Sequence, residues 1–300
     1  MSQISDVCEN RDVNRYLFET CTRLLPAAAL ATVAAVTTVL FHPAIAKAEM
    51  LDDAKENGVT IAVANEPPYM QINPDGTPGG WGPEMDAAVL KEAGVAKFSG
   101  QLMEYGAMIP ALQSNRADLA SSGALYIKPE RCEAVLFSDP VSCSGESLIM
   151  AAALREKVKT YDDVAKQGLK IGVCGGCTEQ KLALEAGVKE DSVVVFPDGA
   201  SGLKLLEDGR IDVFANDSAT TANLFKRLDP ADWHYVRIEN IRSCGGAAFN
   251  KNSAELRDAY NDGLRRIRAN GTYMKIMKKY GLQEDARDIE KTSTQQLCEK

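Results

Sequence analysis

Residues 121–150 read SSGALYIKPERCEAVLFSDPVSCSGESLIM, and this stretch decides how the rest of the chain is interpreted. It combines an apolar run that ends at Tyr126, an arginine at position 131 two residues after Pro129, and two cysteines. Because proline fixes its own backbone angle and favours the first turn of a helix, we expect Arg131 to point in a defined direction. A guanidinium held in this way suits a carboxylate; an ordinary surface salt bridge is the alternative.

The residues that follow Arg131 predict a crossing between two domains. After Cys132 the chain reads AVLFSDP, a short strand ended by Asp139 and Pro140, and it resumes as an apolar extended segment at residues 144–153. A second extended segment, GGAAFNK, lies at residues 245–251. If both segments cross between two lobes, they form a hinge and a cleft lies between the lobes.

The composition narrows the class of protein. The chain has 300 residues, of which 45% are hydrophobic and 25% charged, so it can fill one large or two medium domains. A net charge of -8 and a pI near 5.0 argue against a nucleic-acid partner. The sequence contains two histidines and no serine or cysteine with an identifiable base, so we predict no enzyme, no cofactor and no metal site. Small solutes are the expected partners.

The amino terminus has the pattern of a secretory signal. Residues 24–41 are apolar, Arg15 and Arg23 precede them, and Ala46-Lys47-Ala48 follows. A small-residue site after such a run predicts a signal peptide over residues 1–48 and export to the periplasm. A membrane anchor is the alternative, but a spanning helix needs about 20 apolar residues.

The cysteines outside the predicted signal suggest disulfides, because exported proteins are usually oxidised. Cys132 and Cys143 flank a strand and a turn that could double back, so we predict this disulfide first. Spacing does not fix the connectivity of the other four, which are Cys174, Cys177, Cys244 and Cys298. The pair in Cys174-Gly-Gly-Cys177 could be a redox dithiol, but no thioredoxin-like pattern surrounds it, so a structural disulfide is favoured.

Strands and helices alternate along the chain in two successive units. The first unit alternates from residue 58 to residue 123, and the second from residue 160 to residue 217. This is the α/β pattern, in which ligands bind at the carboxyl ends of the strands. Glu66, Tyr105 and Tyr126 all fall at such ends.

Several motifs together resemble the type II periplasmic solute-binding proteins of the polar amino-acid family, which are receptor subunits of ABC importers. The motifs are ANEPPY (64–69), DGTPGGWGPEMDAAV (75–89), YGAMIPALQSNRADLASSG (105–123), IKPERCEAVLFSDP (127–140), GRIDVFAND (209–217) and GGAAFNK (245–251). The resemblance implies an α/β fold with two lobes, each a mostly parallel sheet flanked by helices, joined by two hinge strands. It implies that residues 49–145 and 242–300 form lobe one and residues 146–241 form lobe two. It also implies a monomer that delivers its ligand to the importer's permease subunits.

Within this family, the glutamate of ANEPPY, the PERC sequence and a second cysteine before Gly-Glu are most similar to ectoine and hydroxyectoine receptors. The resemblance implies that Arg131 clamps the ligand carboxylate and that Glu66 pairs with the amidinium. It implies that three tyrosines box the ring and that Thr178, at the start of a helix, also meets the carboxylate. The three tyrosines are Tyr69, Tyr105 and Tyr126.

Two other functions stay open. Asp217 occupies the position at which amino-acid receptors hold the α-ammonium, so the site has two acids, Glu66 and Asp217, for one cation. A polar or cationic amino acid is therefore an alternative ligand. The fold also occurs in periplasmic dehydratases of prephenate or arogenate, in which Glu66 would protonate a leaving group.

Overall fold

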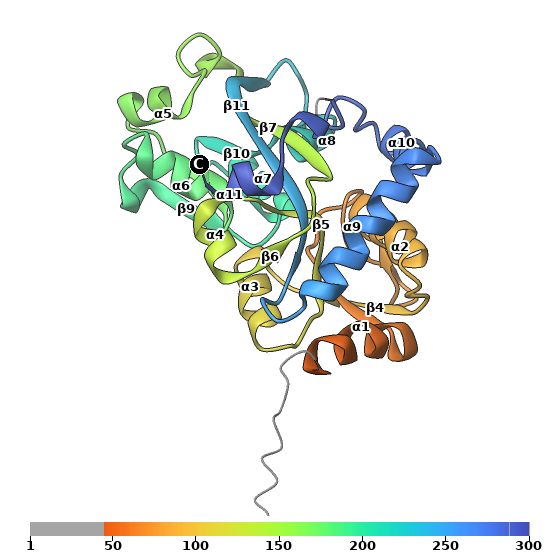
Figure 1. The fold of residues 1–300 in the computed structure, drawn as a ribbon. Coiled ribbons are helices and arrows are strands. Elements are labelled where there is room, and N and C mark those ends of the chain that lie inside the picture. Colours follow the sequence, from red (N-terminus) through yellow and green to blue (C-terminus); the bar gives the residue numbers. More distant parts are fainter. Residues whose placement is uncertain (1–44, 288, 300) are drawn as a thin grey trace, which may run out of the picture. The chain divides into compact units, whose positions relative to one another are not determined.

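The computed structural model describes residues 45–287 and 289–299 (Figure 1). The predicted signal peptide lies almost wholly outside these residues and stays a prediction. Among the described residues, no helix is both long enough and apolar enough to cross a membrane.

The amino-terminal half of the described chain alternates strands with helices. In order, its elements are α1 (Ile45–Asn57), β1 (Val59–Val63), β2 (Gln71–Ile72), β3 (Pro78–Gly79), α2 (Trp81–Glu92), β4 (Phe98–Leu102), α3 (Tyr105–Gln113), β5 (Leu119–Tyr126), α4 (Pro129–Ala134), β6 (Leu136–Phe137) and β7 (Ser142–Ala151). The helix at α4 begins at Pro129, as the sequence predicts, because a proline at the first helical position loses no hydrogen bond.

The carboxyl-terminal half continues the alternation. Its elements are η1 (Ala152–Leu154), α5 (Tyr161–Gln167), β8 (Ile171–Cys174), α6 (Thr178–Glu185), η2 (Glu190–Ser192), β9 (Val193–Phe196), α7 (Gly199–Glu207), β10 (Val213–Asp217), α8 (Ser218–Phe225), β11 (Trp233–Phe249), α9 (Ala254–Ala269), α10 (Thr272–Lys279), η3 (Ile289–Lys291) and α11 (Thr294–Cys298). Local caps set several of these bounds; Thr160 and Asp163 form a capping box before α5, and Gly168 ends it in a left-handed conformation.

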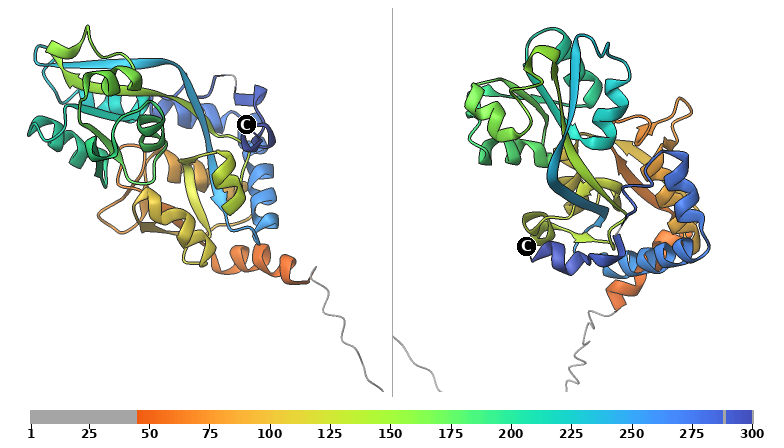
Figure 2. Two further views of the ribbon diagram at one scale, coloured as in Figure 1. Left: turned by 90° about the vertical axis from the view of Figure 1, so that its left-hand side faces the viewer. Right: turned by 90° about the horizontal axis from the view of Figure 1, so that it is seen from above.

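One continuous sheet runs through both lobes in the order β4-β1-β5-β11-β7-β10-β8-β9. The outer strands pair in parallel, β1 with β4 and β5, and β8 with β9 and β10. The two central strands, β7 and β11, pair with each other in antiparallel orientation from Trp233 and Ala151 to Gly245 and Ser142. Figure 2 shows these two strands running side by side from one lobe to the other. The predicted α/β fold with two lobes and two hinge strands is confirmed.

The second hinge strand is longer than the sequence suggests. Residues 233–249 form the single strand β11, whereas the predicted extended segment covers residues 245–251. The pairing of β11 with β7 shifts register between Ile238 and Arg242, and such an irregularity lets a strand bend without ending. The shift lies near the lobe boundaries predicted at residues 145/146 and 241/242, and those boundaries stay a prediction.

Each lobe packs helices on both faces of its part of the sheet. Side chains alternate along β1: Ile61 and Val63 pack with α2, α9 and α10, whereas Ala62 packs on the other face with α3. Helices α2 and α9 lie next to each other on the first face (Figure 1). The second lobe has two corresponding cores, one centred on Val173 and Val213 and the other on Phe196 and Phe214. Helices cover the faces of the sheet, so the ends of the strands between the lobes are the part of the sheet that is left to form a binding site.

The predicted disulfide between Cys132 and Cys143 is wrong. Cys143 on β7 lies directly opposite Cys244 on β11, and these two residues form a disulfide. Cys132 on α4 is bonded to Cys298 on α11, which packs against α4. The chain does not double back after α4, because β6 pairs with the far end of β11, at Ala248 and Phe249. The third disulfide joins Cys174 and Cys177.

Candidate functional site

One pocket lies between the two lobes, at the ends of strands from both. All seven residues that the sequence predicts as ligand contacts line it: Glu66, Tyr69, Tyr105, Tyr126, Arg131, Thr178 and Asp217. The structure therefore brings the predicted residues together.

Arg131 supplies the positive charge of the pocket. Its two terminal nitrogens donate hydrogen bonds to backbone carbonyls, Nη1 to Tyr126 at 3.1 Å and Nη2 to Gly176 at 2.8 Å. Burial lowers its pKa, although the charge of Glu179 acts in the opposite direction. Within the described ranges, Arg131 forms no salt bridge with a carboxylate of the chain. A partly buried cation held by carbonyls alone is a good partner for an anionic ligand group.

Glu66 supplies a buried acid on the lobe-one side. Its side chain is 4% exposed, and Oε1 accepts a 2.6 Å hydrogen bond from the backbone N–H of Gly199, the first residue of α7 in lobe two. Burial raises the pKa of Glu66 to about 8; the Gly199 hydrogen bond lowers it, and the charge of Asp217 raises it further. The carboxyl is therefore mostly protonated at neutral pH unless a cation lies against it.

Three tyrosines line the pocket from three different segments of lobe one. Tyr69 follows the turn after β1, Tyr105 is the first residue of α3, and Tyr126 is the last residue of β5. The hydroxyl of Tyr69 donates a 3.2 Å hydrogen bond to the carbonyl of Ala219 in lobe two. Burial raises the pKa of all three, so they stay neutral over the physiological range.

Trp81 also lies in the wall of this pocket, although the sequence gives it no ligand contact. It is 5% exposed, and its indole N–H donates a 3.1 Å hydrogen bond to the sulfur of Met277. The indole nitrogen is thus engaged by the core of lobe one, and its ring contributes apolar surface.

Lobe two contributes Thr178 and Asp217. Thr178 is the first residue of α6, where backbone N–H groups are unpaired and favour an anion. Asp217 ends β10 and caps α8, since its Oδ1 accepts hydrogen bonds from the N–H groups of Ala219 at 2.9 Å and Thr220 at 3.1 Å. Asp217 therefore has a structural role that the sequence reading missed. Burial raises its pKa above the usual value.

Two further acids line the pocket that the sequence reading also missed. Glu179 is 2% exposed, and burial with the charge of Asp217 raises its pKa to about 7. Asp285 is 9% exposed, and burial with the charge of Asp217 raises its pKa to about 6. The position of Glu179 next to Thr178 could have indicated it, whereas nothing in the local sequence marks Asp285. Acids outnumber the single arginine, which favours a ligand that carries a cation as well as a carboxylate.

Hydrogen bonds and an ion pair join the lobes around the pocket. Asn65 donates to Asp198 at 3.1 Å, and Lys181 on α6 pairs with Glu130 on α4 at 2.9 Å. Together with the contacts of Glu66, Tyr69 and Arg131, these interactions hold the two lobes against each other. The structure is thus a closed arrangement of the cleft.

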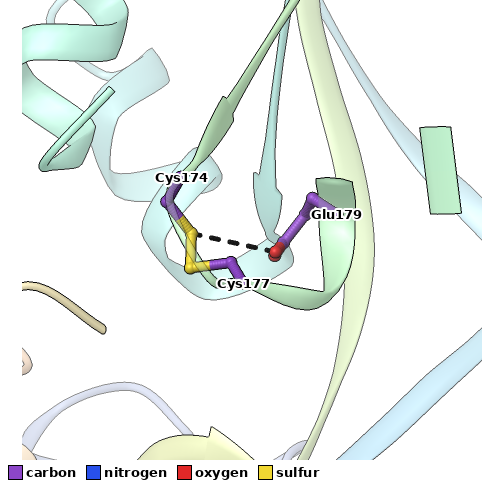
Figure 3. Close-up of side chains that lie close together, drawn as sticks. All are labelled: Cys174, Cys177 and Glu179. Atoms are coloured by element: carbon purple, nitrogen blue, oxygen red, sulfur yellow. Dashed lines mark hydrogen bonds between the residues drawn. A yellow bond between two sulfur atoms is a disulfide. The ribbon is translucent and has the colours of Figure 1, made fainter. Parts of the chain in front are cut away.

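Cys174, Cys177 and Glu179 form a cluster of potential metal ligands at the edge of the pocket (Figure 3). Their ligand atoms lie within 4.8 Å of one another. The two sulfurs are joined in a disulfide, however, and metals bind the thiolate. The donor set in this form does not suit a metal ion.

Comparisons with known proteins agree with this architecture. A family model described as bacterial extracellular solute-binding proteins, family 3, matches residues 59–283. The chain belongs to this family. This family 3 protein is 32% identical over 286 residues to a probable amino-acid ABC transporter periplasmic-binding protein, y4tE, of Sinorhizobium fredii, covering 92% of this chain and 95% of that protein. It is a solute-binding receptor of an amino-acid-type ABC importer.

Many solved structures resemble this family 3 receptor, and two of them bear on its ligand. The crystal structure of EhuB in complex with hydroxyectoine has a TM-score of 0.77 and 40% identity, covering 83% of this chain and 97% of that chain. The ancestral amino-acid-binding protein AncCDT-1, described as a precursor of cyclohexadienyl dehydratase, has a TM-score of 0.67 and 27% identity, covering 77% and 98%. The predicted family is confirmed.

Proposed function

We propose that this receptor captures ectoine or hydroxyectoine in the periplasm and delivers it to the permease subunits of its importer. The observation that carries the proposal is that one tyrosine-lined pocket contains both the buried Glu66 and Arg131, which forms no salt bridge among the residues that the structure describes. The similarity to EhuB, whose structure contains hydroxyectoine, supports the same ligand class.

The charges of the pocket match a compact zwitterion. The ligand carboxylate would bind Arg131 and the N–H groups at the start of α6, next to Thr178. The amidinium would lie against Glu66, with its delocalised charge over the tyrosine rings. Such a cation over an aromatic face gains about 0.5–2 kcal/mol for each well-placed ring. A ligand of this kind satisfies the arginine and the glutamate at once.

Capture then follows the hinge architecture. The ligand first meets lobe one, which carries Glu66, Arg131 and the tyrosines. Lobe two closes over it and brings Gly199 to Glu66 and Gly176 to Arg131, the contacts seen in the closed structure. The permease recognises the closed form.

Two observations are the reason to test an amino-acid ligand and a dehydratase activity as alternatives. Asp217 and Asp285 add acidity to the pocket, which suits the ammonium of an ordinary or cationic amino acid. Glu66, with a pKa of about 8, holds a proton at neutral pH and could protonate a leaving group, as a dehydratase requires. The resemblance to AncCDT-1 is the reason to test the second alternative.

Isothermal titration calorimetry of the purified, oxidised protein separates these functions. The panel contains ectoine, hydroxyectoine, arginine, glutamine and glycine betaine, and we expect binding of the ectoines alone. Arg131→Ala should abolish that binding, whereas the exposed Arg265→Ala on α9 should leave it unchanged. Binding of an amino acid in place of the ectoines would refute the ligand and shift the cation site to Asp217. A separate incubation with prephenate tests the dehydratase alternative, and its conversion to an aromatic product would refute a purely binding role.

A further inference from the structure

The Cys174–Cys177 disulfide differs from the other two disulfides in what it joins. Cys132–Cys298 and Cys143–Cys244 link residues that are 166 and 101 positions apart in the sequence. Cys174–Cys177 closes a loop of two glycines between the end of β8 and the start of α6, beside the pocket (Figure 3). Because the loop is so short, this bond constrains the unfolded chain least of the three. Its contribution to the stability of the fold is expected to be the smallest.

The two sulfurs of this disulfide differ in accessibility. Cys174 is 1% exposed at the end of the buried strand β8. Cys177 is partly exposed, occupies the N-cap position of α6 and lines both the pocket and a groove between α4 and α6. Thiol–disulfide exchange needs a thiolate to reach one sulfur while the other sulfur leaves. Cys177 is the more exposed of the two residues, so its sulfur is the one that a reductant would attack, and Cys174 is then the leaving group.

Glu179 lies where the leaving group needs a proton. Its Oε2 is 3.9 Å from Cys174 Sγ (Figure 3). A disulfide sulfur carries no hydrogen, so a proton shared in this contact belongs to the carboxyl. Burial raises the pKa of Glu179 to about 7, which keeps the carboxyl substantially protonated up to neutral pH. The charged and titratable groups that face this carboxyl are Glu146 on β7, Asp217 at the end of β10, Arg131 on α4, Tyr161 on α5, Tyr126 on β5 and Tyr105 on α3, together with Glu66.

The loop closed by this disulfide touches the ligand-binding machinery. The carbonyl of Gly176 accepts the 2.8 Å hydrogen bond from Arg131 Nη2. A Cβ added to Gly176 would lie 2.6 Å from the Cα of Gly106, so the loop packs directly on the start of α3 in lobe one. Backbone hydrogen bonds from Gly175 N–H to Phe196 at 3.2 Å and from Cys177 N–H to Cys174 at 3.3 Å also hold the loop. Because Gly175 and Gly176 have no side chains, the disulfide adds the covalent restraint on where the Gly176 carbonyl lies.

We propose that Cys174–Cys177 is a thiol–disulfide exchange site for a dithiol reductant, and that opening it weakens ligand capture by releasing Gly176 from Arg131. The effect on capture rests on the proposed function. One thiolate of the reductant forms a bond to Cys177 Sγ, and the bond to Cys174 breaks. Cys174 leaves as a thiolate and takes the proton of Glu179. The second thiol of the reductant then attacks the reductant's sulfur in the mixed disulfide, the bond to Cys177 breaks, and the proton of the attacking thiol passes to Cys177. This gives an oxidised reductant and a Cys177 thiol. Glu179 regains its proton from solvent, and two electrons and two protons have passed from the reductant to the protein.

The first experiment measures which of the two cysteines forms a mixed disulfide faster. Cys174→Ser leaves the Cys177 thiol, and Cys177→Ser leaves the Cys174 thiol; each variant is treated with glutathione disulfide and followed by intact mass. We expect the mixed disulfide to form at least tenfold faster on Cys177. In the wild-type protein, dithiothreitol followed by alkylation and peptide mapping should open Cys174–Cys177 before the other two disulfides. Equal rates for the two variants, or equal opening of all three disulfides, would overturn the exchange site.

The second experiment tests Glu179 as the proton donor. The rate of reduction by dithiothreitol, expressed per reductant thiolate, should fall as the pH rises through 7 in the wild-type protein, because Glu179 loses its proton there. Glu179→Gln should show a slower rate without this fall. Glu207→Gln, an exposed change on α7 in the same lobe, should follow the wild-type profile. A Glu179→Gln profile identical to that of the wild type refutes the donor role.

The third experiment tests the link to ligand capture. Ectoine affinity is compared between the oxidised wild type and Cys174→Ser/Cys177→Ser, with far-ultraviolet circular dichroism and urea unfolding to establish that both are folded. We expect the affinity of the folded double variant to be at least tenfold weaker. Unchanged affinity overturns the link. If the oxidised wild type binds no ectoine, the proposed ligand fails, but the exchange rates still decide whether the site exists.

Discussion

The affinity for ectoine is expected to rise with pH because Glu66 must lose a proton to pair with the amidinium. The pKa of Glu66 is raised to about 8 in the folded protein, mainly by burial. By the titration curve of one group, about 1% of Glu66 is ionised at pH 6 and about 90% at pH 9. If the bound cation lowers this pKa below 6, the association constant rises about 90-fold between these pH values, or about 2.7 kcal/mol. Above pH 9 the affinity should level off.

Glu66→Gln isolates this contribution from the other acids of the pocket. The glutamine keeps the size and one acceptor of the side chain but cannot ionise. We expect a weak affinity that resembles that of the wild type at low pH and lacks the rise around pH 8. Glu179 and Asp285, with pKa values of about 7 and 6, act at lower pH and remain in this variant. Glu104→Gln, an exposed change beside Tyr105, is the matched control and should keep the wild-type curve.

The assay is isothermal titration calorimetry at several pH values from 6 to 9. Repeating the titration at pH 7 in buffers of different ionisation enthalpy counts the protons released, and we expect about 0.9 from Glu66 for each ligand bound. The amidinium and the carboxylate of ectoine keep their charges over this range, so the protons come from the protein. A wild-type affinity independent of pH, or the same slope in Glu66→Gln, refutes the reasoning.

Three further outcomes are expected. Because folding raises the pKa of Glu66 from 4.5 to about 8, ionisation of Glu66 opposes folding increasingly as the pH rises through this window. In urea unfolding at pH 9, Glu66→Gln should therefore be more stable than the wild type by up to about 5 kcal/mol. This difference in stability should shrink toward pH 4.5. Asp86→Ala should cost about 3 kcal/mol in the same assay with ectoine affinity retained, since buried Asp86 accepts 2.6 Å hydrogen bonds from the hydroxyls of Ser121 and Tyr260. Gly123→Ala should reduce both stability and affinity, because Gly123 has a φ of +79° and its new Cβ would collide with the ring of Trp81 in the pocket wall.

The fold could be predicted because its signals are local. The alternation of strands and helices depends on short stretches, and Pro129 before Arg131 marks the start of α4 without reference to any other segment. The positions of Tyr105 and Tyr126 follow from the ends of a helix and a strand that are visible in the sequence. Strand ends of an α/β sheet converge, so residues placed at such ends are expected to meet.

The features that the sequence reading missed depend on distant pairings. Cys143 meets Cys244 because β7 and β11 pair in one particular register, which the spacing of the cysteines does not contain. Asp285 reaches the pocket because its segment is held against β7, where its carbonyl accepts a 2.8 Å hydrogen bond from the N–H of Cys143. The cap that Asp217 forms on α8 is a local signal, although the sequence analysis predicts Asp217 only as a ligand contact.

Glu66 links ligand charge to closure in the proposed mechanism. In the closed cleft it is 4% exposed and its known partner is the N–H of Gly199 in lobe two. Burying an ionised carboxylate with one hydrogen bond is unfavourable, so closing the cleft without a cation requires Glu66 to be protonated.

A cationic ligand removes this requirement, because it pairs with the carboxylate while Gly199 still donates to it. The free-energy difference between open and closed forms thus depends on the charge that the ligand brings, and a neutral molecule of the same size would close the cleft less well. Comparing the affinities for ectoine and for an uncharged ring analogue, in the wild type and in Glu66→Gln, measures this dependence directly. The preference for ectoine should shrink in the variant. An unchanged preference would assign the discrimination to another acid of the pocket.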